Sequence, residues 1–142
     1  MSQQNLTNHG RMHPMYHYIA APLVLVGFIG SLVNLLNCKP DQCYSASLLV
    51  VAFILLFLIG AMLRTYALKA QDRAIRAEEN LRHFMLTGKA FDARLNIRQI
   101  IALRFASDAE LPALAEKAAN ENLRSKEIKQ LIKDWRADNY RI

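Results

Sequence analysis

Two long stretches of this 142-residue chain contain no Asp, Glu, Lys, Arg or His. They run from Ile19 to Leu36 and from Ser45 to Leu63, and each is about as long as a helix that crosses a hydrocarbon core of roughly 30 Å. Proline (four residues) and glycine (five residues) are scarce, which excludes a low-complexity chain and favours helix throughout. The sequence therefore predicts an all-α protein built on a transmembrane helical hairpin.

The sequence also lacks the usual signatures of catalysis and transport. No Gly-rich phosphate loop, His-Glu-x-x-His motif or nucleotide-binding fingerprint is present. The two apolar stretches carry none of the ionisable residues that mark an ion or proton path through a membrane. We therefore expect neither an enzyme nor a self-sufficient transporter, and we expect no cofactor.

Three regions follow from this pattern. Residues 1–18 form a polar, flexible arm, residues 19–63 form the hairpin with spans 19–36 and 45–63, and residues 64–142 form a charged helical domain. No small-residue cleavage site follows the first span, so we interpret it as retained rather than as a cleaved signal. Within it, Gly27 and Ser31 have the small-xxx-small spacing that favours close packing, here against the second span.

The charges predict the orientation of the hairpin. The net charge is +6, and Arg64, Lys69, Arg73 and Arg76 follow the second span closely. Positive charge beside a span marks the cytoplasmic side of a membrane. We therefore expect a multi-pass protein of the cell inner membrane, with both termini in the cytoplasm.

The second span has no helix breaker at its inner end. One helix is predicted from about Ser45 to Thr87, and Gly88 is placed to end it at the C′ position. Acid-before-base pairs such as Glu78 and Arg82 support it. Beyond the span, one face of this helix carries an alanine-rich stripe, formed by Ala67, Ala70, Ala74, Ala77, Leu81 and Phe84. Such a stripe requires a close partner, either the helices of the same tail or another protomer.

Two of three shorter helices are predicted from capping signals. Asn96 is expected to cap a helix from Ile97 to about Phe105. Ser107 and Glu110 have the spacing of a capping box, which predicts the start of the next helix.

A third short helix is predicted from Lys126 to about Asn139, with Ser125 as its cap and Trp135 on its apolar face. Its opposite face is basic and consists of Lys126, Lys129, Lys133 and Arg136. This basic face has three interpretations: a solvated surface, a contact with anionic headgroups, or a contact with nucleic acid through a loose helix-turn-helix arrangement. Interleaved acids and a connecting turn without glycine argue against nucleic acid.

Two cysteines flank the short loop between the spans. Cys38 and Cys43 are compatible with a disulfide that closes the hairpin turn, with two free thiols, or with a metal site. The metal site would need further ligands, and the loop offers only Asp41.

Three histidines recur every four residues before the first span. His9, His13 and His17 would lie on one face of a continuous helix, which is ligand-like geometry for zinc, copper or nickel. Gly10 and Pro14 oppose a helix through all three, so we expect no metal there.

Two segments carry a resemblance to a known family. They are Leu63–Arg82 and Ile97–Asp108, and the Gln71-Asp72-Arg73 sequence is the most specific part. Together with the hairpin they resemble a family of small bacterial two-span proteins classified as a domain of unknown function. The resemblance implies a membrane location and this architecture, and it brings no activity, ligand or catalytic residue.

A dense polar band follows the second span. Its members are Arg64, Tyr66, Lys69, Gln71, Asp72, Arg73, Arg76, Glu79 and Arg82. Their density exceeds what solubility requires, so we expect the band to bind a partner or anionic lipid headgroups. The sequence thus predicts a non-enzymatic protein that assembles through this helix, as a homo-oligomer or as an accessory subunit of a larger membrane complex. The alternative is a membrane-tethered module whose basic tail recruits a cytosolic partner or nucleic acid.

Overall fold

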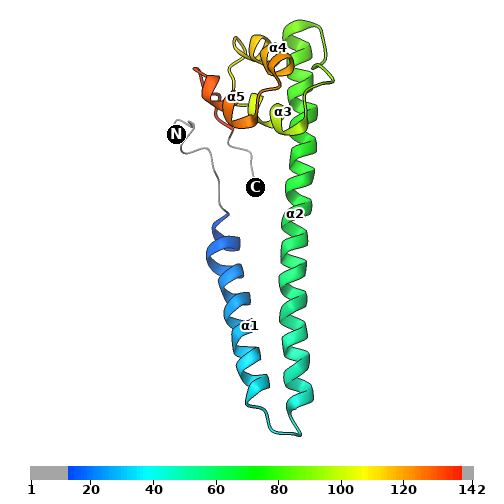
Figure 1. The fold of residues 1–142 in the computed structure, drawn as a ribbon, viewed down its shortest axis with the longest axis vertical. Helices are drawn as coiled ribbons and strands as arrows, with labels where there is room; N and C mark the ends of the chain where they lie inside the picture. The colour runs from blue at the N-terminus through cyan, green and yellow to red at the C-terminus, as the bar shows by residue number, and fades with distance from the viewer. Residues whose placement is uncertain (1–12, 139–142) are drawn as a thin grey trace. The chain divides into compact units, whose positions relative to one another are not determined.

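The computed structural model describes residues 13–138, and within them all regular structure is helical apart from one isolated β-bridge. The elements are η1 (Met15–Ala20, a π-helix), α1 (Ala21–Leu36), α2 (Cys43–Thr87), α3 (Ile97–Leu103), α4 (Leu111–Glu121) and α5 (Ser125–Leu131) (Figure 1). The predicted all-α fold is confirmed. The chain divides after Ala67 into two compact units, called here the hairpin unit and the helical domain. Helix α2 contributes to both.

The first apolar helix begins as a π-helix, which we attribute to Pro22. Proline has no N–H group and its ring clashes with the carbonyl four residues earlier, so the usual hydrogen bond to Tyr18 is not available. Instead the hydrogen bonds here span five residues rather than four, as in a π-helix. The N–H of Ala21 donates to the carbonyl of Tyr16. Helical structure thus begins at Met15, before the predicted span.

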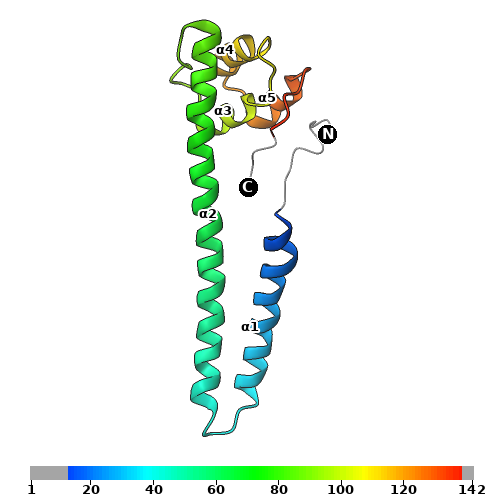
Figure 2. The ribbon, with the colours of Figure 1, turned by 180° about the vertical axis from the view of Figure 1, so that it is seen from behind.

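The hairpin unit leaves most of its apolar surface uncovered. Helix α1 and the first part of α2 run side by side and are joined at the loop (Figure 1 and, from behind, Figure 2). Leu23, Val26 and Phe57 are among the large apolar side chains that point outward. The helix formed by η1 and α1 together (Met15–Leu36) and helix α2 are each long and apolar enough to span a membrane.

The two spans meet through a side chain at Gly27. A methyl group at Gly27 would overlap the ring of Phe53, whereas one at Gly30 would meet nothing. Ser31, one turn after Gly27, is buried, and its hydroxyl donates to the carbonyl of Phe28 (2.7 Å). The small-xxx-small spacing therefore makes room for an aromatic ring of the second span.

We expect Gly27→Ala to destabilise the hairpin by about 1 to 3 kcal/mol, because the added methyl overpacks the Phe53 site. Gly30→Ala is the matched control and is expected to have little effect. Thermal unfolding of the full-length protein in mild detergent, followed by circular dichroism, measures both. Adding Phe53→Ala to Gly27→Ala is expected to relieve the overlap, and equal behaviour of the two glycine variants would contradict this packing.

Helix α2 is continuous from Cys43 to Thr87, which corresponds to about 65 Å at 1.5 Å per residue. Gly88 follows with a φ of 72°, and its N–H donates to the carbonyl of Phe84 (2.7 Å). Glycine adopts this left-handed conformation without a Cβ clash. The predicted long helix and its glycine stop are confirmed.

The helical domain has its own apolar core. Leu103, Phe105, Leu111 and Ile128 are its largest fully buried side chains, and α3 packs against both α4 and α5. Helix α3 begins with the predicted cap: Asn96 accepts from the N–H of Gln99 (3.1 Å) while Gln99 accepts from the N–H of Asn96 (2.8 Å).

The predicted capping box of Ser107 and Glu110 is wrong. Among residues 13–138 the buried Ser107 hydroxyl has no hydrogen-bond partner. The Glu110 carboxylate instead accepts from the backbone N–H groups of Lys133 and Asp134 (3.3 Å each). Helix α4 starts only at Leu111, which places a proline in its first turn, where a missing N–H has no cost. A contact distant in sequence therefore replaces the local cap.

The third short helix is shorter than predicted. Helix α5 ends at Leu131, and Asn139 lies outside the described residues. At Ile132 the chain leaves the helix, and residues 134–136 pair with the segment that follows α3. The N–H of Arg136 donates to the carbonyl of Phe105 (2.8 Å), and Trp135 forms the β-bridge with Ala106. Tertiary hydrogen bonds thus override the helical pattern of this segment.

The predicted cap of the third helix is also wrong. Ser125 is the first residue of α5, and its hydroxyl donates to the carbonyl of Arg98 in α3 (2.9 Å). The carboxylate of Glu127 accepts from the backbone N–H of Arg124 (2.6 Å) and holds the start of the helix.

Candidate functional site

The predicted polar band separates into residues with different surroundings. Arg64 and Tyr66 lie in the hairpin unit, where the guanidinium carbon of Arg64 is 5.3 Å from the ring centroid of Tyr16. This is cation–π distance, and it ties the end of the second span to the start of the first. Tyr66 is exposed.

Arg82 and Glu79 hold α2 against the helical domain. Arg82 donates to Glu79 (2.9 Å), to Asp108 (2.6 Å) and to the backbone carbonyl of Ala106 (2.8 Å). Glu79 is only 7% exposed, and Arg136 approaches its second oxygen at 3.6 Å. The guanidinium therefore connects one turn of α2 with the chain that follows α3. Arg82 pairs with Glu79 and Asp108 rather than with Glu78, the partner expected from the i,i+4 spacing.

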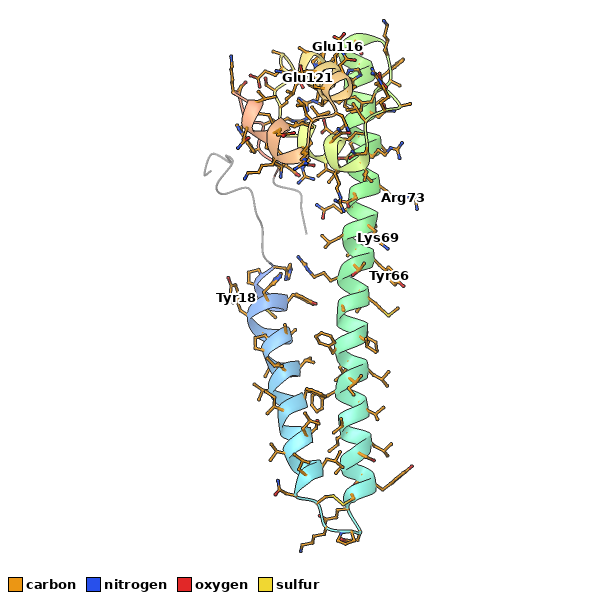
Figure 3. The ribbon with its side chains drawn as sticks, in the orientation of Figure 1. Tyr18, Tyr66, Lys69, Arg73, Glu116 and Glu121 are labelled. Carbon is orange, nitrogen blue, oxygen red and sulfur yellow. A yellow bond between two sulfur atoms is a disulfide. The ribbon has the colours of Figure 1, made fainter. Side chains whose placement is uncertain are left out.

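The remaining cations of the band are surface groups. Lys69, Arg73 and Arg76 are exposed, and within residues 13–138 none of them forms an ion pair. Lys69 and Arg73 project from the same side of α2 (Figure 3). Gln71 and Asp72 are half-buried. Of the nine predicted residues, these three exposed cations are therefore the ones that can bind an external partner.

A cleft of about 450 Å³ lies beside two of these cations. Arg73 and Arg76 line it from α2, and its opposite wall includes the apolar side chains of Phe91, Ile97 and Ile100. Guanidinium groups beside an apolar wall suit an anionic group that carries an apolar attachment.

Asp92, at the rim of the same cleft, is already engaged. The guanidinium of Arg94 donates to both carboxylate oxygens of Asp92, at 3.0 and 2.7 Å. The backbone N–H of Arg94 also donates to this carboxylate (2.8 Å). These hydrogen bonds lower the pKa of Asp92 to about 2 and raise the pKa of Arg94. The pair stays charged at neutral pH and holds the loop between α2 and α3.

A second cleft, of about 600 Å³, contains a histidine that the sequence analysis did not identify. His83 lines it with Thr87, Arg94 and Glu116. Its Nδ1 lies 2.9 Å from the carbonyl of Lys89, which requires a proton on Nδ1, and its ring stacks on Phe91 with 4.4 Å between centroids. In the sequence, the signal that could have pointed to His83 is its position one turn before the end of the long helix.

The structure assembles no metal site from the described histidines and cysteines. Among residues 13–138 no group of three His, Cys, Asp or Glu side chains is arranged to hold an ion. Nδ1 of His17 lies 3.0 Å from the backbone carbonyl of His13. His9 lies outside the described residues.

The predicted basic face is not continuous. Lys126 and Lys129 lie on α5, whereas Lys133 and Arg136 follow its end in a non-helical segment. Lys129 lies over the ring of Phe105 at 5.5 Å. Because α5 ends at Leu131, helical spacing no longer aligns the four cations on one face.

The loop of the hairpin carries a disulfide. The structure joins Cys38 to Cys43, with 5.2 Å between their Cα atoms. Cys43 is also the first residue of α2, so the bond connects the loop to the start of the second apolar helix. Of the three interpretations left open by the sequence, the structure contains the disulfide.

We expect the disulfide to contribute about 2 kcal/mol, since the loop that it closes is short. Maleimide labelling of the purified protein is expected to modify no cysteine before reduction and both after it. Cys38→Ser leaves Cys43 unpaired and is the positive control for labelling. Modification of both cysteines without reductant would contradict a stable bond.

Comparison with known proteins places the chain in a family. No curated protein and no solved structure matches it. A family model described as a family of unknown function covers residues 1–142, so the expected relationship to such a family is confirmed. The chain therefore belongs to the family of unknown function DUF6526.

Proposed function

We propose that this protein is a non-enzymatic, integral membrane protein that assembles through α2, as a homo-oligomer or as an accessory subunit of a larger membrane complex. The observation that carries the proposal is the uncovered apolar surface of the hairpin. Only 6% of the most apolar part of each long helix is buried. An apolar helix in the core of a water-soluble protein would be mostly buried, so lipid is the natural cover for this surface.

The orientation that we propose places both termini on the cytoplasmic side of the inner membrane. Lys69, Arg73 and Arg76 support it, since they are exposed and follow the second apolar stretch. The Cys38–Cys43 disulfide supports it from the other end, because disulfides persist on the oxidising side of a membrane.

An assembly role fits the contacts of the polar band better than a catalytic one. Its buried charges, Glu79 and Arg82, are used to hold the helical domain on α2. Within residues 13–138 its exposed cations form no ion pair, and they lie on the surface of a long helix. Such groups bind partners or anionic headgroups at a surface.

Native mass spectrometry of the full-length protein, gently extracted from its own membranes, tests this proposal. We expect the protein to stay in the membrane through an alkaline wash and to appear as a discrete oligomer or a stoichiometric complex. The variant Lys69→Glu/Arg76→Glu is expected to lose bound anionic lipid or a partner. A lipid-bearing monomer, unchanged by this variant, would overturn the assembly role.

A second function is favoured by the turn between α4 and α5. Asn122 has a φ of 49° and so adopts the left-handed conformation that glycine often supplies in a helix-turn-helix. A membrane-tethered module that recruits a cytosolic partner or nucleic acid therefore remains our alternative. Salt-dependent binding of duplex DNA by the full-length protein, lost in Lys126→Glu, would favour it.

A further inference from the structure

One face of α2 in the helical domain has the spacing of a coiled-coil seam. Residues 70, 74, 77, 81 and 84 alternate steps of four and three, which corresponds to heptad positions d, a, d, a and d. The side chains are Ala70, Ala74, Ala77, Leu81 and Phe84, and all of them are exposed. Leu81 is 59% and Phe84 is 51% exposed, although both are large and apolar.

The helical domain packs on the opposite face of the same helix. Ile75 and Glu79 are the buried residues of this part of α2, and the side chain of Arg82 is 12% exposed. In the same register these are positions b, f and b, which point away from a coiled-coil seam. The helices of the same tail thus leave the stripe from Ala70 to Phe84 exposed, although Ala77 also lines the cleft that Arg73 and Arg76 share with Phe91.

The charges that flank the seam match those of a second, parallel copy. Arg73 occupies a g position and Glu78 the following e position, and in a parallel pair each g residue faces the next e residue of the partner. Both side chains are exposed, and within the described part of the chain neither forms an ion pair. A two-fold axis would therefore create two equivalent Arg73–Glu78 pairs across the seam.

The membrane supplies the orientation and the local concentration that this short seam needs. Two copies with the same topology in one bilayer present α2 in the same direction, so their pairing is parallel. About two heptads, mostly alanine, would associate weakly in water. Anchoring both helices in one membrane raises their effective concentration.

We propose that a second copy of this chain packs along α2 from Ala70 to Phe84 as a parallel, two-stranded coiled coil, with Arg73 of each copy paired to Glu78 of the other. The proposal rests on the membrane-bound assembly proposed above. The partner is a second copy of the same chain, and the heptad positions of residues 70 to 84 set the register of the pair.

Cysteine cross-linking of the full-length protein in its own membranes tests the seam. In a Cys38→Ser/Cys43→Ser background, Ala77→Cys at a d position is expected to form a disulfide-linked dimer on mild oxidation. Asp72→Cys, at an f position one to two turns earlier, is the matched control and is expected to remain monomeric. Cross-linking of Ala77→Cys to a different protein, or equal cross-linking at both positions, would overturn the proposal.

Charge reversal tests the register. Arg73→Glu is expected to lower the dimer association constant by about tenfold, because it replaces two attractions by two repulsions. Arg73→Glu/Glu78→Arg is expected to restore dimerisation. Arg98→Glu, at an exposed position of α3, is the control and is expected to leave the dimer unchanged. Unaltered Trp135 fluorescence confirms that each variant is folded.

The outcomes separate this inference from the proposed function. If Ala77→Cys stays monomeric while the protein still purifies in a larger membrane complex, the coiled coil is wrong and the assembly role stands. If Ala77→Cys cross-links but an alkaline wash releases the protein, the membrane-anchored function is wrong. Equal dimerisation of Arg73→Glu and Arg98→Glu would overturn the parallel register.

Discussion

Phe105→Ala is expected to destabilise the helical domain strongly. Phe105 is fully buried, with its ring centroid 5.2 Å from that of Trp135. Removing a buried phenylalanine ring costs about 3 to 5 kcal/mol. A domain of about 70 residues has a free energy of unfolding of only about 4 to 10 kcal/mol. The expected loss is therefore a large fraction of that stability.

The only tryptophan of the chain reports this unfolding. Trp135 is half-buried in the helical domain, so its fluorescence follows the domain while the apolar helices stay in detergent. We expect the urea midpoint of the full-length protein to fall steeply in Phe105→Ala. Phe57→Ala removes an equally large ring that is 67% exposed in the hairpin and is expected to leave the midpoint unchanged. Equal midpoints in the two variants would show that Phe105 does not support the core.

Arg82→Met is expected to destabilise the same domain by about 3 kcal/mol. The change leaves Glu79 buried, with Arg136 at 3.6 Å as its remaining ion-pair partner among residues 13–138. It also removes the hydrogen bond from Arg82 to the carbonyl of Ala106. A buried carboxylate without its main partner retains the cost of its lost hydration. The helical domain then loses the contact that fixes it to α2.

The same fluorescence measurement checks Arg82→Met against two further variants. Arg76→Met removes an exposed guanidinium that forms no ion pair within residues 13–138. It is expected to change stability by less than about 0.5 kcal/mol. Arg82→Lys keeps the charge but loses the planar fork that reaches three acceptors, so we expect an intermediate loss. A stability of Arg82→Met equal to that of Arg76→Met would contradict a structural role for this cluster.

Local signals predicted the elements whose ends depend on neighbouring residues. The charge-free runs predicted two long apolar helices, Gly88 predicted the end of α2, and Asn96 predicted the start of α3. In each case the decisive interaction joins residues at most five apart. A cap or a left-handed glycine stabilises its helix end wherever that helix packs.

Local signals failed where a distant segment competed for the same groups. Glu110 was expected to cap α4 and instead binds the backbone at Lys133 and Asp134. The segment after Leu131 has a helical pattern, yet its N–H and C=O groups pair with Phe105 and Ser107. Hydrogen-bond partners more than twenty residues away leave no mark in a capping rule or a helical period.

The candidate site shows the same division. Composition and position identified the polar band, but they treated its nine residues alike. Only the folded chain separates Glu79 and Arg82, which hold the domain together, from Lys69, Arg73 and Arg76, which remain on the surface. The stack of His83 on Phe91 joins helix and loop and has no local signature.

By itself the sequence determined the helical class of this protein, its two apolar helices and the continuity of the second of them, because apolar runs, helix formers and breakers act locally. The tertiary structure decided which face of α2 the helical domain covers and which charges are left unpaired. Those outcomes depend on how the domain closes on itself, through the Phe105 core and the Arg82 cluster. They leave the alanine-rich stripe of α2 exposed from Ala70 to Phe84, where a partner can pack against it.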